Sequence, residues 1–377
     1  MDNINELIKK LCPDGVEYHE LKNSNLFKFY YGKGNKIPED IGGKYDVYGA
    51  NGVVSHINEY NCEDVSIIGH IGAVGMVNRC KGKCFVTYNG TIAEVVDKSK
   101  VDSQYLYYVL TTLNLPSYKK GSQPFLSVSD FEKIRIPLPP LDIQIEIARI
   151  LDGFTLLLTE LSSELRAREK QYDFYKEKLL TISKTDETIE WVTLGSYCKR
   201  LKGTAITAGK MKEIENVNGN VKIFAGGKTV IDTDESNIPA EDIIRVPNII
   251  VQSRGVIDFI YYDKPCSFKR EMWSYTLDNE ITLKYIYYYL KKNVEYFRQR
   301  GSQMGSMPQI SLDVTEKYKI PLPSLKEQEK IVNILNKFDK LCNDTSDGIP
   351  AEIEKRQKQY EYYRDKLLSF KEVQVNE

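Results

Sequence analysis

Short loops rich in Lys, Arg, Asn, Gln and Gly hold the side chains with the clearest chemical potential. They include "YGKGNK", "KRLKGT", "VQSRG" and a tripeptide, Gly-Ser-Gln, that occurs twice. Lysine and arginine neutralise phosphates, whereas Arg, Asn and Gln form paired hydrogen bonds with guanine or adenine edges. One such residue is ordinarily just a solvated loop side chain, but their recurrence at corresponding loops favours a nucleic-acid interface. The residues that we expect to contact DNA are Lys33, Asn35, Lys36, Asn51, His70, Lys119, Lys120, Ser122, Gln123, Lys199, Arg200, Lys202, Thr204, Lys228, Gln252, Ser253, Arg254, Arg300, Ser302 and Gln303.

Motifs for catalysis are weak by comparison. "GTAITAGKM" has one residue too many between its glycines for a phosphate-binding loop, and "GHIGAVG" lacks the G-x-G-x-x-G spacing of a dinucleotide site. "PDGVEYHELK" resembles a nuclease carboxylate cluster through Asp14, Glu20 and Lys22, but the matching second segment lacks the acid and the lysine. We therefore expect no catalytic residue in this chain.

The seven cysteines are odd in number and scattered in spacing, which is not the pattern of a disulfide framework. Cys80 and Cys84, with Cys62 and His70 upstream, offer one tight ligand pair, whereas structural zinc sites usually have two. We expect reduced thiols and no metal. The sequence has no secretory signal and no apolar run of membrane-spanning length, so we expect a cytoplasmic protein without a membrane partner.

The net charge of −1 conceals two mildly basic blocks. Residues 21–135 hold 14 basic and 11 acidic side chains, and residues 191–319 hold 19 and 15. Two polyanion-binding domains on an acidic frame would have this pattern, and so would ordinary charge scatter.

The elements that position these loops occur twice. "IPLPPLDIQIEIARIL" (136–151) matches "IPLPSLKEQEKIVNIL" (320–335), and "REKQYDFYKEKLL" (168–180) matches "RQKQYEYYRDKLL" (356–368). Heptad spacing from Ile143 to Leu179 predicts a helix of about 40 residues that needs a partner helix to bury its apolar seam. The second copy offers that partner, interrupted at "DGIP", where Gly348 can end one helix and Pro350 can begin another. Two helices packed on separate domains are the alternative.

The segments between these helices mix short β-branched or aromatic runs with Gly- and Asn-rich turns, which indicates sheets. We predict an α/β (α+β) fold with two globular domains containing twisted sheets, long antiparallel coiled-coil helices and a pseudo-two-fold internal repeat. The predicted divisions are residues 1–138 and 185–322 for the globular domains, and 139–184 and 323–377 for the helices. The residues expected on the helix seam or in partner docking are Gln144, Ile147, Phe154, Tyr172, Tyr175, Gln328, Ile331, Phe338, Tyr360 and Tyr363.

The repeated "I-P-L-P-x-L-x-x-Q" signature, with the tyrosine-rich helix "RQKQYEYYRDKLLSF", resembles the specificity subunits of type I restriction–modification systems. The resemblance covers essentially the whole chain, and Gln144 matches Gln328 although "DIQIE" differs from "KEQEK". It implies a non-catalytic subunit with two target-recognition domains, each binding one half of a bipartite double-stranded DNA sequence. It also implies docking of two adenine-methyltransferase subunits and, through them, restriction subunits. Cofactors would belong to those partners: S-adenosylmethionine, ATP and magnesium.

Three other classes remain open on the residues alone. A specificity subunit of a fused methyltransferase–nuclease would have the same repeats. A stand-alone DNA-binding regulator would share the basic loops but would not need two helical docking surfaces. A coiled-coil adaptor would need the helices but not the loop chemistry.

Overall fold

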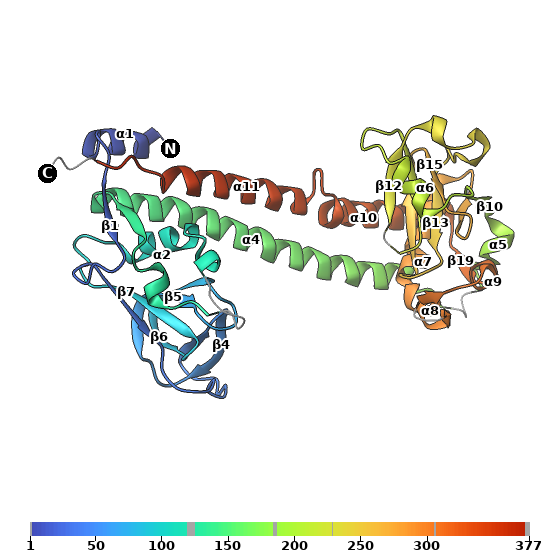
Figure 1. Cartoon of the computed structure of the whole chain (residues 1–377). Coiled ribbons are helices and arrows are strands. Elements are labelled where there is room, and N and C mark those ends of the chain that lie inside the picture. Colours follow the sequence, from blue (N-terminus) through green and yellow to red (C-terminus); the bar gives the residue numbers. More distant parts are fainter. Residues whose placement is uncertain (1, 119–124, 184–186, 228, 305–306, 374–377) are drawn as a thin grey trace. The chain divides into compact units, whose positions relative to one another are not determined.

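The structure is a computed structural model that describes residues 2–118, 125–183, 187–227, 229–304 and 307–373 (Figure 1). Contacts divide the chain into two units. Unit 1 contains Met1–Ser162 and Glu352–Glu377, and unit 2 contains Ser163–Ala351. Each unit has its own sheet and core, as the predicted two-domain α/β fold requires.

Unit 1 is built on a six-stranded sheet with the order β2-β7-β5-β6-β3-β4. All neighbours are antiparallel except β3 and β6, which run parallel. The central strand β5 is buried along most of its length because its run "VSII" is apolar or small. The strands are β2 (Phe27–Tyr31), β3 (Tyr45–Gly49), β4 (Gly52–Ile57), β5 (Cys62–Gly69), β6 (Val77–Val86) and β7 (Gly90–Val95).

Unit 2 repeats this sheet in two pieces, with the orders β10-β16-β13-β14 and β12-β11-β15. The order of strands across the sheet matches that of unit 1 if β14 and β15 together correspond to the single long strand β6. The parallel pair recurs as β11 and β15. The strands are β10 (Lys199–Lys202), β11 (Val221–Phe224), β12 (Val230–Thr233), β13 (Asn248–Gln252), β14 (Asp258–Tyr262), β15 (Cys266–Phe268) and β16 (Trp273–Thr276). The duplication therefore includes the stretches 53–100 and 229–280, whose sequences hardly match.

The proline-rich signature forms a short strand in each unit, as its extended character predicts. In unit 1, β8 (Arg135–Leu138) pairs with β1 (Glu17–Glu20), and in unit 2, β19 (Lys319–Leu322) pairs with β9 (Glu190–Thr193). Proline has no amide N–H to donate. It is tolerated here because each strand pairs on one side only, so no hydrogen bond is needed on the other side. A further hairpin in unit 2 joins β17 (Ser302–Met304) to β18 (Met307–Gln309).

Two aromatic helices, one in each unit, are fully buried on one side. They are α2 (Ser103–Thr112) in unit 1 and α7 (Glu280–Lys292) in unit 2, whose side chains Tyr105, Tyr108, Tyr285 and Tyr288 are almost inaccessible. Each begins at a capping side chain, Asp102 or Asn279, that accepts a hydrogen bond from the first turn. The other short helices are α1 (Asp2–Leu11), η1 (Leu115–Tyr118), α3 (Val128–Phe131), α5 (Leu194–Tyr197), α6 (Ala208–Glu213), η2 (Glu235–Asn237), η3 (Ala240–Asp242), α8 (Val294–Arg300) and α9 (Leu312–Glu316).

The long predicted helix is α4, Leu141–Leu180, a continuous helix of 40 residues (Figure 1). Its first half belongs to unit 1 and packs beside α11 (Ile349–Leu367), and its second half belongs to unit 2, where α10 (Leu325–Asn343) is its partner. Phe154 stacks on Tyr363 at 5.6 Å in unit 1, and Tyr175 stacks on Phe338 at 5.4 Å in unit 2. The predicted helical pairing is confirmed within each unit.

The predicted interruption of the second helical copy is also confirmed, but its capping differs from the expectation. Asp344 caps α10, and its carboxylate accepts the Ser346 N–H at 2.8 Å. Gly348 does not adopt a positive φ. Its lack of a side chain is needed instead because a Cβ there would lie 2.6 Å from the Lys340 carbonyl oxygen.

The two ends of the described chain meet in unit 1. Val16 N–H donates to the Lys371 carbonyl at 2.8 Å, and Val373 N–H donates to the Val16 carbonyl at 3.0 Å. Among the helices of the described ranges, none combines the length and the apolar character needed to cross a bilayer.

Candidate nucleic-acid interface

Four segments of unit 1 are joined by backbone hydrogen bonds, and we call this group the first loop cluster. It consists of Tyr31–Lys33 at the end of β2, His70–Ile71 after β5, Thr87–Asn89 after β6, and Phe125–Leu126. The backbone hydrogen bonds that join these loops run from Lys33 N–H to Val86 O (2.9 Å), from Thr87 N–H to Tyr48 O (3.0 Å) and from Leu126 N–H to His70 O (3.1 Å). At Gly32 a Cβ would lie 2.1 Å from the Thr87 oxygen, so only glycine permits this approach.

The second loop cluster is the same arrangement in unit 2. It consists of Lys202–Thr204 at the end of β10, Gln252–Gly255 at the end of β13, Lys269–Glu271 after β15, and Pro308–Ile310 at the end of β18. The matching hydrogen bonds run from Thr204 N–H to Phe268 O (2.8 Å), from Lys269 N–H to Phe224 O (3.0 Å) and from Ile310 N–H to Ser253 O (3.0 Å). Gly203 repeats the role of Gly32, since a Cβ there would lie 1.9 Å from the Phe268 oxygen.

The structure brings several predicted DNA-contacting residues into these clusters, and it separates them into two kinds. Exposed side chains are Lys33 in the first cluster, with Asn51 in the adjoining β3–β4 turn, and Lys202 and Arg254 in the second. Buried side chains are His70, Thr204, Gln252 and Ser253, each less than 10% exposed. The buried group shapes the loops: Gln252 donates to the Gly227 carbonyl at 2.8 Å, and the Ser253 hydroxyl donates to the Glu271 carbonyl at 3.1 Å.

Other predicted residues lie away from the hydrogen-bonded loops. Asn35 and Lys36 are exposed in the segment between β2 and β3, and Lys199 is exposed at the start of β10. Arg200 forms an ion pair with Glu316 at 3.0 Å, and Arg300 packs its guanidinium 3.5 Å from the ring centroid of Tyr296. Lys119, Lys120, Ser122, Gln123 and Lys228 lie outside the described residues, as do the side chains of Ser302 and Gln303.

The two clusters differ in their electrostatics. In the first, burial lowers the pKa of His70, which keeps the imidazole neutral at neutral pH. The ring packs against Tyr31 at 4.7 Å and Phe125 at 5.5 Å, and its Nδ1 lies 3.0 Å from the Thr91 hydroxyl. In the second, burial would raise the pKa of Glu271, but the Lys269 ammonium at 2.9 Å makes the net shift downward.

Several exposed residues of the clusters were missed by the sequence reasoning. They are Tyr31, Ile71, Tyr88 and Phe125 in the first cluster and Arg270 in the second. For the four residues of the first cluster the signal was available, since each lies within two residues of a predicted position or of a glycine, whereas Arg270 lies near neither. Apolar residues were passed over because only polar side chains were considered.

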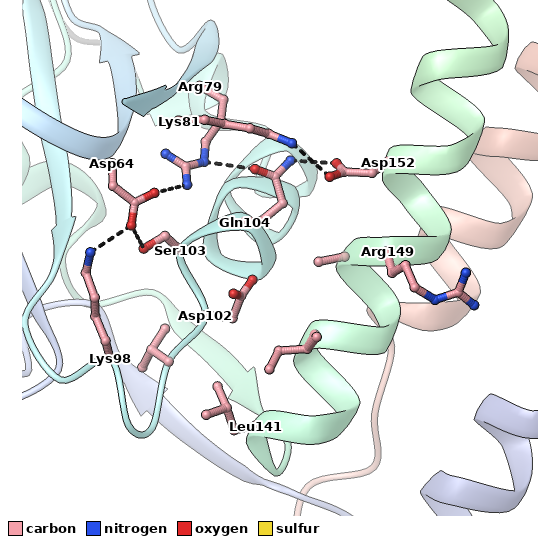
Figure 2. A pocket seen from close by; sticks show the side chains of 13 residues that line it. Asp64, Arg79, Lys81, Lys98, Asp102, Ser103, Gln104, Leu141, Arg149 and Asp152 are labelled. Atoms are coloured by element: carbon pink, nitrogen blue, oxygen red, sulfur yellow. Dashed lines mark hydrogen bonds and ion pairs between the residues drawn. The ribbon is translucent and has the colours of Figure 1, made fainter. Parts of the chain in front are cut away.

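A polar network ties the sheet of unit 1 to α4 and lines an open pocket (Figure 2). The Asp152 carboxylate on α4 accepts hydrogen bonds from Gln104 at 2.8 Å and Tyr108 at 2.6 Å, and it pairs with Lys81 at 2.8 Å. Arg79 donates to the Gln104 side chain at 3.0 Å and continues the network to the sheet. Every side chain in the network has a partner of complementary charge or polarity, so its geometry suits a structural joint.

At the sheet end of this network, Asp64 pairs with Arg79 and with Lys98 at 2.7 Å, and it accepts the Ser103 hydroxyl at 3.0 Å (Figure 2). Asp64 lies at a β-bulge and has a φ of 54°, a left-handed conformation that turns its carboxylate toward Arg79. Burial would raise the pKa of Asp64, but these partners make the net shift downward.

The predicted seam and docking residues are also of two kinds. Gln144 and Gln328 are buried and bind their own units. Gln144 donates to the Lys100 carbonyl at 2.8 Å and accepts from the Asp102 N–H at 2.9 Å, and Gln328 donates to the Pro323 carbonyl at 2.8 Å. The aliphatic and aromatic members line helix contacts or the adjoining cores: Ile147, Phe154, Tyr172, Tyr175, Ile331, Phe338, Tyr360 and Tyr363.

Three of the cysteines of unit 1, Cys62, Cys80 and Cys84, lie in the sheet. The Cys62 and Cys84 sulfurs are 3.6 Å apart, and the Cys80 thiol donates to the Gly82 carbonyl at 2.9 Å. Within the part of the chain that the structure describes, no group of three or more His, Cys, Asp or Glu side chains is arranged to hold a metal ion.

Comparison with known proteins gives consistent results. A family model described as "Type I restriction modification DNA specificity domain" matches residues 16–168 and 187–355. The EcoR124I/EcoR124II specificity subunit of a type I restriction enzyme from Escherichia coli is 34% identical over 73% of this chain and 72% of its own length. The MpnII specificity subunit from Mycoplasma pneumoniae is 28% identical over 67% of this chain and 93% of its own length.

One solved structure supports the fold. The crystal structure of a type I restriction-modification S subunit from M. genitalium aligns with a TM-score of 0.69 at 18% identity. The alignment covers 94% of this chain and 96% of that one. The double family match and this alignment both extend over the two units.

Proposed function

This chain belongs to the family of type I restriction–modification DNA specificity subunits, and on that premise we propose that its two loop clusters bind double-stranded DNA, each reading one half of a bipartite target. The observation that carries the proposal is the repetition of one loop arrangement in both units, held by three matching backbone hydrogen bonds. A specificity subunit is the non-catalytic member of its complex, so this chain selects the site that other subunits modify or cut.

Charge supports the DNA-binding role of the clusters. Lys33 in the first cluster and Lys202 and Arg254 in the second are exposed. The side chains of Lys33, Lys202 and Arg254 form no hydrogen bond or ion pair with another described side chain. Exposed cations at loop edges neutralise phosphates, and arginine can also read bases. The buried Gln252 and Ser253 hold the Arg254 loop in place, so less conformational entropy is lost on binding.

The chain is part of a type I restriction–modification complex, and the finer composition of that complex is part of the proposal. Two methyltransferase subunits dock on the helices, one on each unit, and restriction subunits bind through them. Leu156, Phe174 and Tyr362 support this docking because they are 60%, 59% and 60% exposed on α4 and α11. S-adenosylmethionine, ATP and magnesium bind to those partners, and the complex acts on DNA in the cytoplasm.

The decisive experiment is methylation mapping of cells that express this chain with its methyltransferase partner. We expect one bipartite adenine-methylated motif that disappears when this chain is omitted. Copurification with separate methyltransferase subunits is expected, whereas copurification with a fused methyltransferase–nuclease would favour that related system. DNA binding without any methyltransferase partner would contradict the proposal in favour of a stand-alone regulator.

The role of the clusters is tested on the purified complex by the salt dependence of DNA affinity. Lys33→Ala and Lys202→Ala should each weaken binding to all sequences and lower the slope of log affinity against log salt by about 1. Lys100→Ala is the matched control because Lys100 is exposed in unit 1 and pairs with Asp97 outside the cluster. Equal slopes for all variants would contradict phosphate binding at the clusters.

A further inference from the structure

The matching hydrogen bonds of the two loop clusters establish which residues occupy equivalent positions. The antiparallel bridge between Ile71 and Phe125 in the first cluster corresponds to the bridge between Arg254 and Gln309 in the second. The parallel bridge between Lys33 and Thr87 corresponds to that between Thr204 and Lys269. The equivalent pairs that follow are Tyr31 with Lys202, Ile71 with Arg254, Tyr88 with Arg270, and Phe125 with Gln309.

These equivalent positions carry opposite chemistry. The first cluster presents apolar or aromatic groups, since Tyr31, Ile71, Tyr88 and Phe125 are 47%, 42%, 37% and 38% exposed. The second presents exposed cations at three of the same four places, Lys202, Arg254 and Arg270, and an amide, Gln309, at the fourth. One scaffold therefore displays an apolar surface beside Lys33 in unit 1 and a guanidinium-bearing surface in unit 2.

The apolar surface of the first cluster is held rigidly. The His70 ring lies beneath it, in contact with Tyr31 and Phe125 and hydrogen-bonded to Thr91. Ile71 and Phe125 are joined by their backbone bridge. Apolar side chains that project from such a surface can recognise the C5-methyl group of thymine in the major groove, and that group is absent from other bases.

Arg254 in the second cluster is equally well fixed at its backbone. Its carbonyl accepts the Gly227 N–H at 3.0 Å, and the following Gly255 N–H donates to the Pro308 carbonyl at 2.9 Å. Gly255 has a φ of 75°, a turn conformation that a larger residue would strain. Neither Arg254 nor Arg270 forms a hydrogen bond or ion pair with another described side chain, although the Glu271 carboxylate interacts electrostatically with Arg254. Both guanidinium groups are exposed and can donate to O6 and N7 of guanine.

We propose that the first loop cluster reads thymine methyl groups, so that its half-site contains A·T pairs, and that the second reads guanine through Arg254. The proposal rests on the proposed DNA-binding function and adds the base class that each unit selects. DNA is the occupant of the apolar surface because the equivalent surface of the other unit is cationic and Lys33 adjoins it.

Arg254→Lys tests the guanine assignment in the methyltransferase-containing complex. Lysine keeps the charge but loses the planar fork, so discrimination at one guanine in one half-site should fall by about tenfold to a hundredfold. Methylation mapping reads this as relaxation at that position, with the other half-site unchanged. Relaxation at a position other than guanine, or an equal loss on all sequences, would overturn the assignment.

The thymine assignment is tested on the unaltered complex, so that folding of a variant is not at issue. Synthetic duplexes replace thymine by deoxyuridine, which lacks only the methyl group, in one half-site at a time. In the half-site that Arg254→Lys leaves unchanged, the affinity should fall by about threefold to tenfold per recognised methyl, and in the other half-site it should stay constant. Equal affinity in both cases would overturn the assignment and leave the apolar surface as a contact for a protein subunit.

Ile71→Ala provides the matched variant in the first cluster. It should abolish the difference between thymine and deoxyuridine while leaving the guanine requirement intact. A complex that retains the full thymine preference would contradict the role of Ile71. Failure of the complex to produce any defined motif would instead contradict the proposed function itself, so the two failures are distinguishable.

Discussion

Asp64 shows how one residue can set the geometry of a domain. Its left-handed backbone at the β5 bulge aims the carboxylate at Arg79, whose side chain is only 9% exposed. Breaking a mostly buried pair leaves an uncompensated charge, and this costs more than the pair itself contributes. The network therefore makes unit 1 sensitive to the charge at position 64.

Asp64→Asn keeps a residue that tolerates the left-handed backbone but removes the negative charge. We expect unit 1 to lose about 2 kcal/mol of stability, below the range for a fully buried pair because Asp64 is 27% exposed. Unit 1 contains no tryptophan, so the measurement is native-state hydrogen exchange of the β5 and β6 amides, which should quicken about thirtyfold. Lys98→Gln is the control, since Lys98 is 62% exposed and its loss should cost less than about 1 kcal/mol.

The same network predicts a pH dependence. Because the pKa of Asp64 is lowered in the folded chain, its contribution is fully present above the ordinary aspartate pKa of about 4. The contribution is lost as the pH falls through the lowered folded value. The exchange difference between the wild type and Asp64→Asn should therefore disappear in acid, and a difference that persists at low pH would contradict the ionic origin.

Helix α4 carries aromatic residues of two kinds: some stack on α10, and one is exposed. Tyr172 and Tyr175 stack on Phe338 of α10, with ring centroids 6.1 and 5.4 Å from its ring. Phe174 lies between them in sequence but is 59% exposed, because consecutive helical residues point about 100° apart. The stacked residues hold the helix pair together, and the exposed one supports the proposed docking surface.

Phe338→Ala and Phe174→Ala form a matched pair that separates these purposes. Phe338→Ala should destabilise unit 2 by about 2 kcal/mol because it removes a half-buried ring and two stacking contacts. Both tryptophans, Trp191 and Trp273, lie in unit 2, so urea unfolding followed by tryptophan fluorescence reports the loss.

Phe174→Ala should leave unfolding within about 0.5 kcal/mol of the wild type but weaken methyltransferase binding by about tenfold or more, as for a buried aromatic interface residue. Pull-down titration measures this second effect. Unchanged partner binding would remove Phe174 from the docking surface without affecting the assignment of Phe338.

At the scale of the whole molecule, α4 carries the chain from unit 1 into unit 2 without a break, whereas its counterpart turns at residues 344–348. Insertion of seven residues after Ser162 and seven in that turn keeps the seam in phase because the apolar pattern repeats every seven residues. The added length of about 10 Å should widen the unread gap by up to about three base pairs.

Methylation mapping should then report the same two half-sites with a longer gap, since neither loop cluster is altered. The control is the same insertion in the exposed segment 34–44 between β2 and β3, which should leave the gap unchanged. An unchanged gap in the helix variant would show that α4 does not set the spacing.

Periodicity and proline were enough to predict much of this architecture. The heptads from Ile143 to Leu179 predicted a helix that matches α4, and the repeated "IPLP" predicted the extended segments that became β8 and β19. The duplication was visible because these frame segments were copied closely. Such features depend on neighbours a few residues apart, and a single sequence therefore determines them.

The composition of the loop clusters was decided only by the tertiary structure. His70, Gln252 and Ser253 look like surface readers in the sequence but are buried, whereas Ile71 and Phe125 look like core residues but are exposed in the first loop cluster. Burial depends on which distant strands pair, and the two sheets match through strands whose sequences have diverged. The equivalence of Ile71 with Arg254 arises from backbone hydrogen bonds, which do not depend on side-chain identity and so leave little trace in the sequence.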